Sequence, residues 1–123
     1  MTAPRVSAGL VRLKRAYEPA APEDGVRVLV DRLWPRGIRK EDAAIDHWMR
    51  EVAPSSALRQ WFGHDPARWP EFRRRYTEEL HAHAEAIEVL RHLARQGTVT
   101  LVFGARDEEH NDAVVLRDIL LGR

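Results

Sequence analysis

The 123-residue sequence contains no cysteine, which excludes a disulfide framework, a thiolate metal site and a cysteine nucleophile. It also contains no run of about 18 apolar residues, so no segment is predicted to cross a membrane. The N-terminal stretch MTAPRVSAG is too short and too polar for a signal peptide. These absences lead us to expect a cytoplasmic protein.

The sequence motifs of common cofactor and nucleotide sites are absent as well. Neither a GxGxxG pattern nor a Walker loop occurs, so the dinucleotide-binding and P-loop NTPase classes have no support. The GxSxG pattern that surrounds the serine nucleophile of many hydrolases is also missing. The sequence therefore identifies no cofactor.

Lysine is scarce, with 2 residues against 18 arginines, although the formal net charge is only +1. The ratio has two explanations: a compositional bias towards arginine, or a need for the planar guanidinium fork that holds carboxylate and phosphate groups. A net charge so close to zero is not typical of a nucleic-acid-binding protein.

Length and composition indicate one folded domain. The chain falls within the usual one-domain range, and 44% hydrophobic with 32% charged residues is typical of a globular protein. We predict a loose N-terminal tail over residues 1–9 and a single α/β domain over residues 10–123.

The apolar pattern along the chain alternates between strand and helix periods. Apolar, β-branched runs predict strands at 10–17, 26–33 and 99–105. Helical spacing and capping residues predict helices at 42–52, 56–62, 67–95 and from 111 onwards. This order predicts an α/β layer structure, in which a long helical crossover makes the second and third strands parallel. The connection at 18–25 is short for a parallel crossover and suits an antiparallel pair, so the direction of the first strand stays open.

The four tryptophans fall between positions 34 and 69. We predict that they form a second small core, with Trp48 and at least one of Trp61 and Trp69 mostly buried against the helical region. The alternative is an aromatic wall on which a base or ring stacks. On the 67–95 helix, a stripe of histidines and glutamates is interpreted as a solvated face rather than a metal site, and no metal is predicted.

Polar side chains gather where the predicted strands end. Parallel α/β sheets bind ligands beyond the carboxyl ends of their strands. Arg15 lies near the end of the first strand, Asp31 and Arg36 follow the second, and Arg106 follows the third. The last helix adds unpaired backbone N–H groups at its start, which attract an anion. The sequence therefore predicts a site for a small anionic ligand at this edge.

Residue chemistry divides this edge into two groups. The candidate ligand-binding residues carry guanidinium or amide groups: Arg15, Arg32, Arg36, Arg106 and Asn111. The candidate acid–base residues are Asp31, Asp107 and His110. Each group also has a structural explanation, because Asp31 can pair with Arg32, and Asp107 or Asn111 can cap the last helix.

Several stretches of the chain resemble a known family. LVDRLWPRG at 29–37, WFGH at 61–64 and TLVFGARD at 100–107 are similar to the domain-of-unknown-function family 488, in its branch of short single-domain bacterial and archaeal proteins. The resemblance covers about residues 12–121 and implies a small Rossmann-like three-layer fold with a mostly parallel sheet. Other branches carry a Cys-His-Arg motif after the last strand, where this chain has His110, Asn111 and Asp112. The resemblance therefore implies no thiol chemistry.

Three functional hypotheses remain open at this point. The first is the binding of a phosphate- or nucleotide-like anion at the arginine-rich edge, with acid–base catalysis as a further step. The second is a non-catalytic nucleotide- or nucleic-acid-binding module that uses the same arginines and the tryptophan region. The third is an interaction protein without a ligand. A closed pocket containing a perturbed carboxylate or histidine favours the first, and an open basic face with exposed aromatics favours the second.

Overall fold

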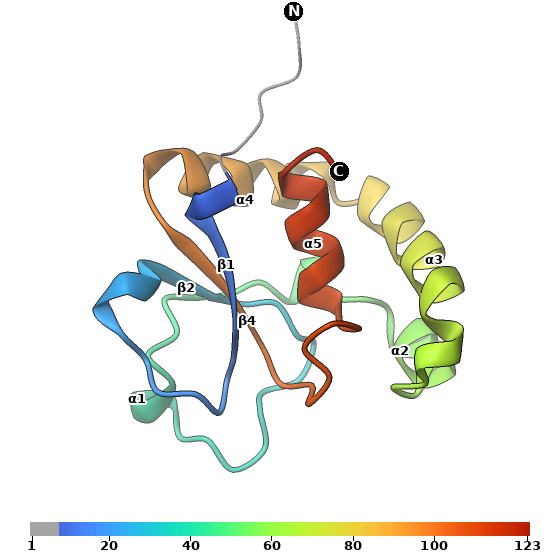
Figure 1. Cartoon of the computed structure of the whole chain (residues 1–123), viewed down its shortest axis with the longest axis horizontal. Helices are drawn as coiled ribbons and strands as arrows, with labels where there is room; N and C mark the ends of the chain where they lie inside the picture. The colour runs from blue at the N-terminus through green and yellow to red at the C-terminus, as the bar shows by residue number, and fades with distance from the viewer. Residues whose placement is uncertain (1–7) are drawn as a thin grey trace, which may run out of the picture.

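Four short strands form one sheet in which every neighbouring pair is parallel. The structure, a computed structural model, describes residues 8–123, and Figure 1 shows the sheet beside the larger helices. The strands, in the spatial order β1-β4-β2-β3, are β1 (Val11–Arg15), β4 (Val99–Phe103), β2 (Val26–Leu29) and β3 (His47–Trp48). The predicted α/β fold with a mostly parallel sheet is confirmed.

The first strand is parallel to its neighbour β4, which settles the question that the short connection left open. An extended segment from Ala16 to Gly25 can span roughly 33 Å, enough to return along the sheet without a helix. The Thr100 hydroxyl donates a hydrogen bond of 2.7 Å to the carbonyl oxygen of Asp24. The connection therefore crosses the sheet over β4 and enters β2 on the far side.

In residues 8–123, five α-helices accompany the sheet: α1 (Lys40–Ala43), α2 (Ser56–Phe62), α3 (Trp69–His81), α4 (Ala84–Gln96) and α5 (Asp112–Leu120). Short 3-10 helices lie at Ala8–Leu10, Pro22–Asp24, Arg50–Val52 and Pro66–Arg68. Residues 1–7 of the predicted tail lie outside the described residues. Among the helices of residues 8–123, none combines the length and the apolar character needed to span a membrane.

The predicted helix at 42–52 is wrong. Helix α1 stops after one turn because Ala44 adopts a left-handed backbone conformation with φ of 51°. The chain then forms β3 beside β2, followed by a 3-10 turn. The apolar residues that imitate a helical period serve two separate cores, since Met49 and Val52 pack on one face of the sheet and Trp48 on the other.

The predicted helix at 67–95 is two helices, α3 and α4. The backbone leaves the helical conformation at His83, with φ of −118° and ψ of 38°, and Figure 1 shows the chain changing direction there. The apolar spacing continues through the break because Leu80 at the end of α3 and Ile87 in α4 contribute to the same core. Periodicity alone therefore could not reveal the bend.

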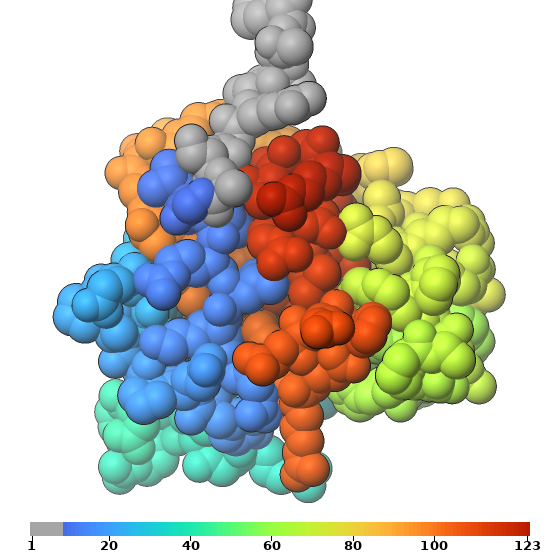
Figure 2. All heavy atoms as spheres, in the orientation of Figure 1, coloured from blue at the N-terminus to red at the C-terminus, as the bar shows by residue number. Residues whose placement is uncertain are grey.

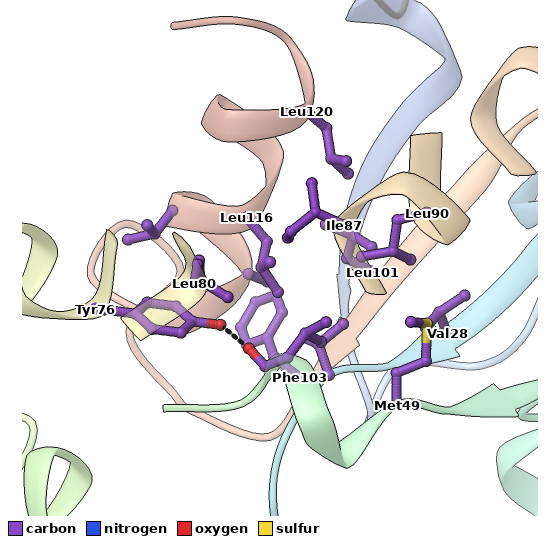
Figure 3. Packing of buried hydrophobic residues seen from close by; sticks show 14 of the residues in the cluster. Val28, Met49, Tyr76, Leu80, Ile87, Leu90, Leu101, Phe103, Leu116 and Leu120 are labelled. Carbon is purple, nitrogen blue, oxygen red and sulfur yellow. Dashed lines mark hydrogen bonds between the residues drawn. The ribbon is translucent and has the colours of Figure 1, made fainter. Parts of the chain in front are cut away.

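The main core lies between the sheet and helices α2 to α5. Alternate strand residues such as Val28, Leu101 and Phe103 point into it, as expected for a strand period of two. Tyr76 of α3 is fully buried there, and its hydroxyl donates a hydrogen bond to the carbonyl oxygen of Val52; Figure 3 shows this bond and the surrounding side chains.

The opposite face of the sheet is covered by extended chain and α1 instead of a layer of long helices. Its small apolar cluster consists of Ala16, Leu29 and Val102, covered by Trp34 and Trp48 among others. Beside this cluster lies a buried ionic network in which Lys14 and Arg27 contact Asp24. Since no long helix of the described chain covers this face of the sheet, the loop that follows β2 is held in place largely by contacts of its own side chains.

Candidate functional site

A cavity of about 340 Å³ opens at the carboxyl edge of the sheet. It lies where the segment after β2, helix α2 and the connection between β4 and α5 meet. Figure 2 shows that connection, in orange, beside β1, in blue, and below α5, in red. The residues around the cavity are Tyr17, Asp31, Arg32, Leu33, Trp34, Pro35, Arg36, Pro54, Arg59, Phe62, His64, Phe72, Gly104, Ala105, His110, Asn111 and Asp112.

Asp31 is fixed in this cavity by contacts on both its main chain and its side chain. The Trp48 indole N–H donates to the Asp31 carbonyl oxygen at 2.8 Å. The backbone N–H of Gly104 donates to Asp31 Oδ2, also at 2.8 Å. A Cβ atom at position 104 would lie only 3.2 Å from the same oxygen. Glycine at position 104 therefore permits the close approach of the carboxylate to the end of β4.

The carboxyl group of Asp112, the first residue of α5, is hydrogen-bonded to the carboxyl group of Asp31. Burial raises the pKa of Asp112 well above its usual range, and the negative charge of Asp31 raises it further. Burial also raises the pKa of Asp31, while hydrogen bonds from Asp112 and Gly104 oppose the rise. The two carboxyl groups therefore favour a state in which the pair holds one shared proton over a state with two ionised carboxylates.

Positive charge surrounds this carboxyl pair. Charges on His64 and Arg59 act to lower the pKa of Asp31, and Arg32 and Arg36 complete the basic part of the lining. In residues 8–123, none of these three arginines has a carboxylate within ion-pair distance. Arg32 donates through Nε to the carbonyl oxygen of Pro54 at 3.1 Å, which leaves its terminal nitrogens free of other protein hydrogen bonds in the described chain.

Arginines elsewhere in the described chain are mostly paired. Ion pairs to carboxylates engage Arg27, Arg39, Arg68, Arg73, Arg74, Arg75, Arg91, Arg95, Arg117 and Arg123. The surface therefore satisfies most of its guanidinium groups with its own carboxylates. The three arginines of the cavity depart from that pattern, although two carboxyl groups lie in the same cavity.

Two predicted ligand-binding arginines lie at the expected edge but outside the cavity lining. Arg15 donates through Nε to the carbonyl oxygen of Ala105 at 2.8 Å, which ties β1 to the end of β4. Arg106 is exposed two residues beyond Gly104. Asp31 and Arg106 converge on one end of the sheet, as predicted, but only Asp31 faces the cavity.

His110 and Asp107 form a second polar pair at the cavity. The distance between His110 Nδ1 and Asp107 Oδ2 is 2.9 Å. Backbone N–H groups of Glu109 and His110, together with the His110 side chain, lower the pKa of Asp107. The contact with Asp107 thus fixes the orientation of the His110 ring. His110 also lines the cavity.

Asn111 uses both ends of its side-chain amide within the protein. Its Oδ1 accepts from the backbone N–H of Val114 at 3.0 Å, and its Nδ2 donates to the carbonyl oxygen of Asp107 at 2.9 Å. The residue therefore caps α5, in agreement with the structural explanation considered from the sequence, and it holds the loop of Asp107 in place.

The tryptophans serve mainly to fix the loops around the cavity. Trp34 and Trp48 pack edge to face with ring centres 5.5 Å apart, and the Trp34 N–H donates to the Ile38 carbonyl oxygen at 2.6 Å. Trp61 and Trp69 pack against the main core. The prediction placed Trp48 on the helical side, whereas it packs on the opposite face of the sheet. All four tryptophans are only partly buried.

The sequence did not single out Asp112, Arg59 or His64 as site residues. Asp112 follows an N-cap residue, where an aspartate ordinarily favours the helix dipole, so its position alone gave no sign of the carboxyl pair. A usable signal was its place at the start of a helix that directly follows the central strand. Within the described residues, no cluster of three or more histidine, aspartate or glutamate side chains is arranged to hold a metal ion.

The fold and this edge define a class: a small parallel α/β protein whose central strands end at a charged, partly apolar cavity. The family model described as the inactive DUF488-N3 subclade matches residues 10–123. The chain belongs to this family, as the resemblance implied.

Relatives of similar length support the assignment. The chain is 49% identical over 113 residues to the uncharacterized protein Rv3073c of Mycobacterium tuberculosis strain H37Rv, which covers 92% of this chain and 95% of the relative. It is 42% identical over 110 residues to the uncharacterized protein YeaO of Escherichia coli strain K12, covering 89% of this chain and 96% of the relative. No solved structure matches the chain.

Proposed function

We propose that the protein binds a small organic anion in the cavity at the carboxyl edge of the sheet. The observation that carries this proposal is the set of cavity arginines without carboxylate partners, Arg32, Arg36 and Arg59, in a protein that pairs most of its other arginines. Guanidinium groups without partners favour a carboxylate or phosphate as the missing partner. The volume of about 340 Å³ lies in the range of small-molecule pockets.

Binding without turnover is the form of this function that the family description supports, because the matching subclade is described as inactive. The groups available for proton transfer remain Asp31, Asp107 and His110, which the sequence also singled out. A cytoplasmic location belongs to the same proposal, and cell fractionation tests it.

A nucleic-acid-binding surface is less well supported. The ring of Trp61 already lies beside the guanidinium groups of Arg68 and Arg75, at 5.3 and 4.4 Å from the ring centre. Both arginines also contact carboxylates. The ring face of Trp61 that a nucleic-acid base would need is therefore occupied by the protein's own side chains.

Thermal-shift measurements with anions test the proposal. Inorganic phosphate, benzoate, ribose 5-phosphate and nucleoside monophosphates form the panel, because a ligand at a hundredfold its Kd adds about 2.7 kcal/mol to the free energy of unfolding. Arg59→Gln is expected to remove most of the shift. Arg106→Gln is the matched control, since Arg106 is exposed on the same edge but outside the cavity.

The outcomes separate the hypotheses. Loss at Arg59→Gln alone, with weak dependence on salt, supports the pocket. Equal losses at Arg59→Gln and Arg106→Gln, with steep dependence on salt, indicate diffuse binding of a polyanion. Absence of any shift across the panel overturns the proposed function. Conversion of a bound compound that Asp31→Asn or His110→Ala abolishes would instead show an enzyme.

A further inference from the structure

The charges of the cavity are separated between the carboxyl pair and the arginines. Asp31 Oδ2 accepts from Gly104 N–H at 2.8 Å, and the Asp31 carboxyl group also shares a hydrogen bond with Asp112. No ion pair joins Asp31 to a cavity arginine in the described chain. An ionised carboxylate offers about four acceptor positions, so Asp31 retains acceptor capacity towards the cavity.

A plain anion satisfies only one part of this arrangement. Its negative charge suits Arg36 and Arg59, but the same charge is repelled by the Asp31 carboxylate. A ligand that fills the cavity must therefore offer a hydrogen-bond donor to Asp31 and an anionic group to the arginines.

The walls between these two ends are apolar and aromatic. Phe62 stacks on Phe72 with ring centres 4.3 Å apart, and Trp34 and Pro54 lie on the lining as well. A flat, largely apolar ligand body fits such walls, because aromatic surfaces favour stacked and edge-to-face contacts.

On the basis of the proposed function, we infer that the ligand is a heteroaromatic anion with a ring or amino N–H group, such as a nucleobase or indole ring joined to a phosphate or carboxylate. Its N–H donates to Asp31, its ring contacts Phe62 and Trp34, and its anionic group binds Arg36 and Arg59. The proton shared by Asp31 and Asp112 keeps the inner end from holding two negative charges.

Matched ligands test the donor directly on the unaltered protein. Calorimetry compares indole-3-acetate with 1-methylindole-3-acetate, and uridine 5′-monophosphate with its 3-methyl form, because each pair differs in the N–H group. The N–H compound of at least one pair is expected to bind about 10- to 100-fold more tightly. Benzoate, which has no hydrogen-bond donor, measures the anionic contact alone.

The protein variant supplies the second arm. Asp31→Asn is expected to remove the preference for the N–H compound while leaving the affinity for benzoate at least as high, which also reports that the variant is folded. Asp65→Asn is the control, since Asp65 is an exposed helix cap that is not part of the cavity lining. Equal binding within both pairs, or benzoate binding as tightly as every N–H anion, overturns the inference. Failure of all anions to bind overturns the proposed function itself.

Discussion

At the level of single residues, two opposing effects act on the charge of Asp112 in the carboxyl pair with Asp31. Asp112 is the first residue of α5. A negative charge is normally favoured at this end of a helix, because the helix dipole is positive there. Burial and the neighbouring carboxylate of Asp31 act in the opposite direction and raise its pKa. The protein therefore carries a carboxyl group that favours its neutral form inside the fold.

Asp112→Asn should stabilise the protein at neutral pH. A pKa raised in the folded state means that the folded protein holds the proton more tightly than the unfolded chain does. The associated stability is complete below the unfolded pKa of about 3.9 and is lost as the pH rises through the raised pKa, by about 1.4 kcal/mol per unit of separation. Asparagine avoids this loss and still offers a donor to Asp31.

Urea unfolding between pH 4 and pH 8 measures the effect. The variant should exceed the original protein in unfolding free energy at about pH 7, and the difference should shrink towards about pH 4. Glu109→Gln, an exposed change on the same loop, should leave the pH profile unaltered. A variant that is less stable by the same amount at every pH would show that the pair does not share a proton.

Gly104→Ala is expected to move the Asp31 carboxylate. The added Cβ would lie 3.2 Å from Oδ2, so the hydrogen bond from the backbone N–H must lengthen. The loss of such a bond to a charged acceptor costs about 1.5–3 kcal/mol in unfolding free energy. Gly97→Ala is the control, because no atom lies within 4 Å of the Cβ position there and its backbone is extended.

A double-mutant cycle makes the Gly104 prediction specific. If the cost arises at Asp31, Gly104→Ala should be nearly neutral in an Asp31→Ala background, where the clashing oxygen is gone. A cost that persists undiminished in that background would contradict this explanation.

At the level of elements, a buried ionic network joins the β1–β2 connection to the sheet. Asp24 accepts hydrogen bonds from Lys14 at 3.2 Å and from Arg27 at 2.6 Å, and its pKa is lowered because these bonds and that from the Ala21 N–H outweigh burial. Arg27 also donates to the carbonyl oxygens of Ala43 and Ala44. One charged pair thus holds the connection, β2 and the end of α1 together.

Asp24→Asn should destabilise the protein by about 3–5 kcal/mol, because it leaves the guanidinium of Arg27 buried without its charge partner. Chemical denaturation measures the loss. Asp42→Asn is a matched control, since Asp42 and Arg39 form a pair of the same sequence spacing whose side chains are 57% and 72% exposed. That change should cost less than about 1 kcal/mol. Comparable costs at the two positions would contradict the role given to burial.

The elements differ in how far the sequence predicted them. Helix α2 was predicted at its observed residues because Ser55 caps it and Gly63 ends it in a left-handed conformation. The three main strands and α5 were predicted within a few residues. The two wrong helix predictions, at 42–52 and 67–95, share one physical cause. In both segments the apolar residues keep a helical spacing although the backbone is not helical around Ile45 and Trp48 in the first and at His83 in the second. The spacing of apolar residues indicates which side chains are buried, but it does not indicate where the backbone changes direction.

For the molecule as a whole, the two faces of the sheet are protected unequally. Helices cover the main core, whereas the opposite face is covered by chain that holds few main-chain hydrogen bonds between Leu33 and Ile38. Amide hydrogen exchange should therefore be slowest in β4 and faster in that segment by at least about two orders of magnitude. Uniform protection across both would show that the segment unfolds only together with the sheet.

The site was only partly predictable at this scale. The rule that ligands bind beyond the carboxyl ends of parallel strands located the correct edge and included Asp31, Arg32 and Arg36. The rule could not indicate which arginines at that edge line the cavity, because this depends on the conformation of the loops. Arg15 bends to the end of β4 and Arg106 turns outwards, while Arg59 arrives from a helix that the rule does not address.

The strand order has a consequence for folding during synthesis on the ribosome. β1 and β2 both pair with β4, and within residues 8–123 β4 is the last strand to be synthesised, followed by α5. In a nascent chain that ends before Val99, β1 and β2 lack the strand that lies between them in the folded sheet. The β2–β3 pairing is then the one strand pairing of the described sheet that can form. The central strand, the backbone donor for Asp31 and the helix that carries Asp112 all follow these elements in the chain, so the sheet and its cavity are completed together, only after β4 and α5 have left the ribosome.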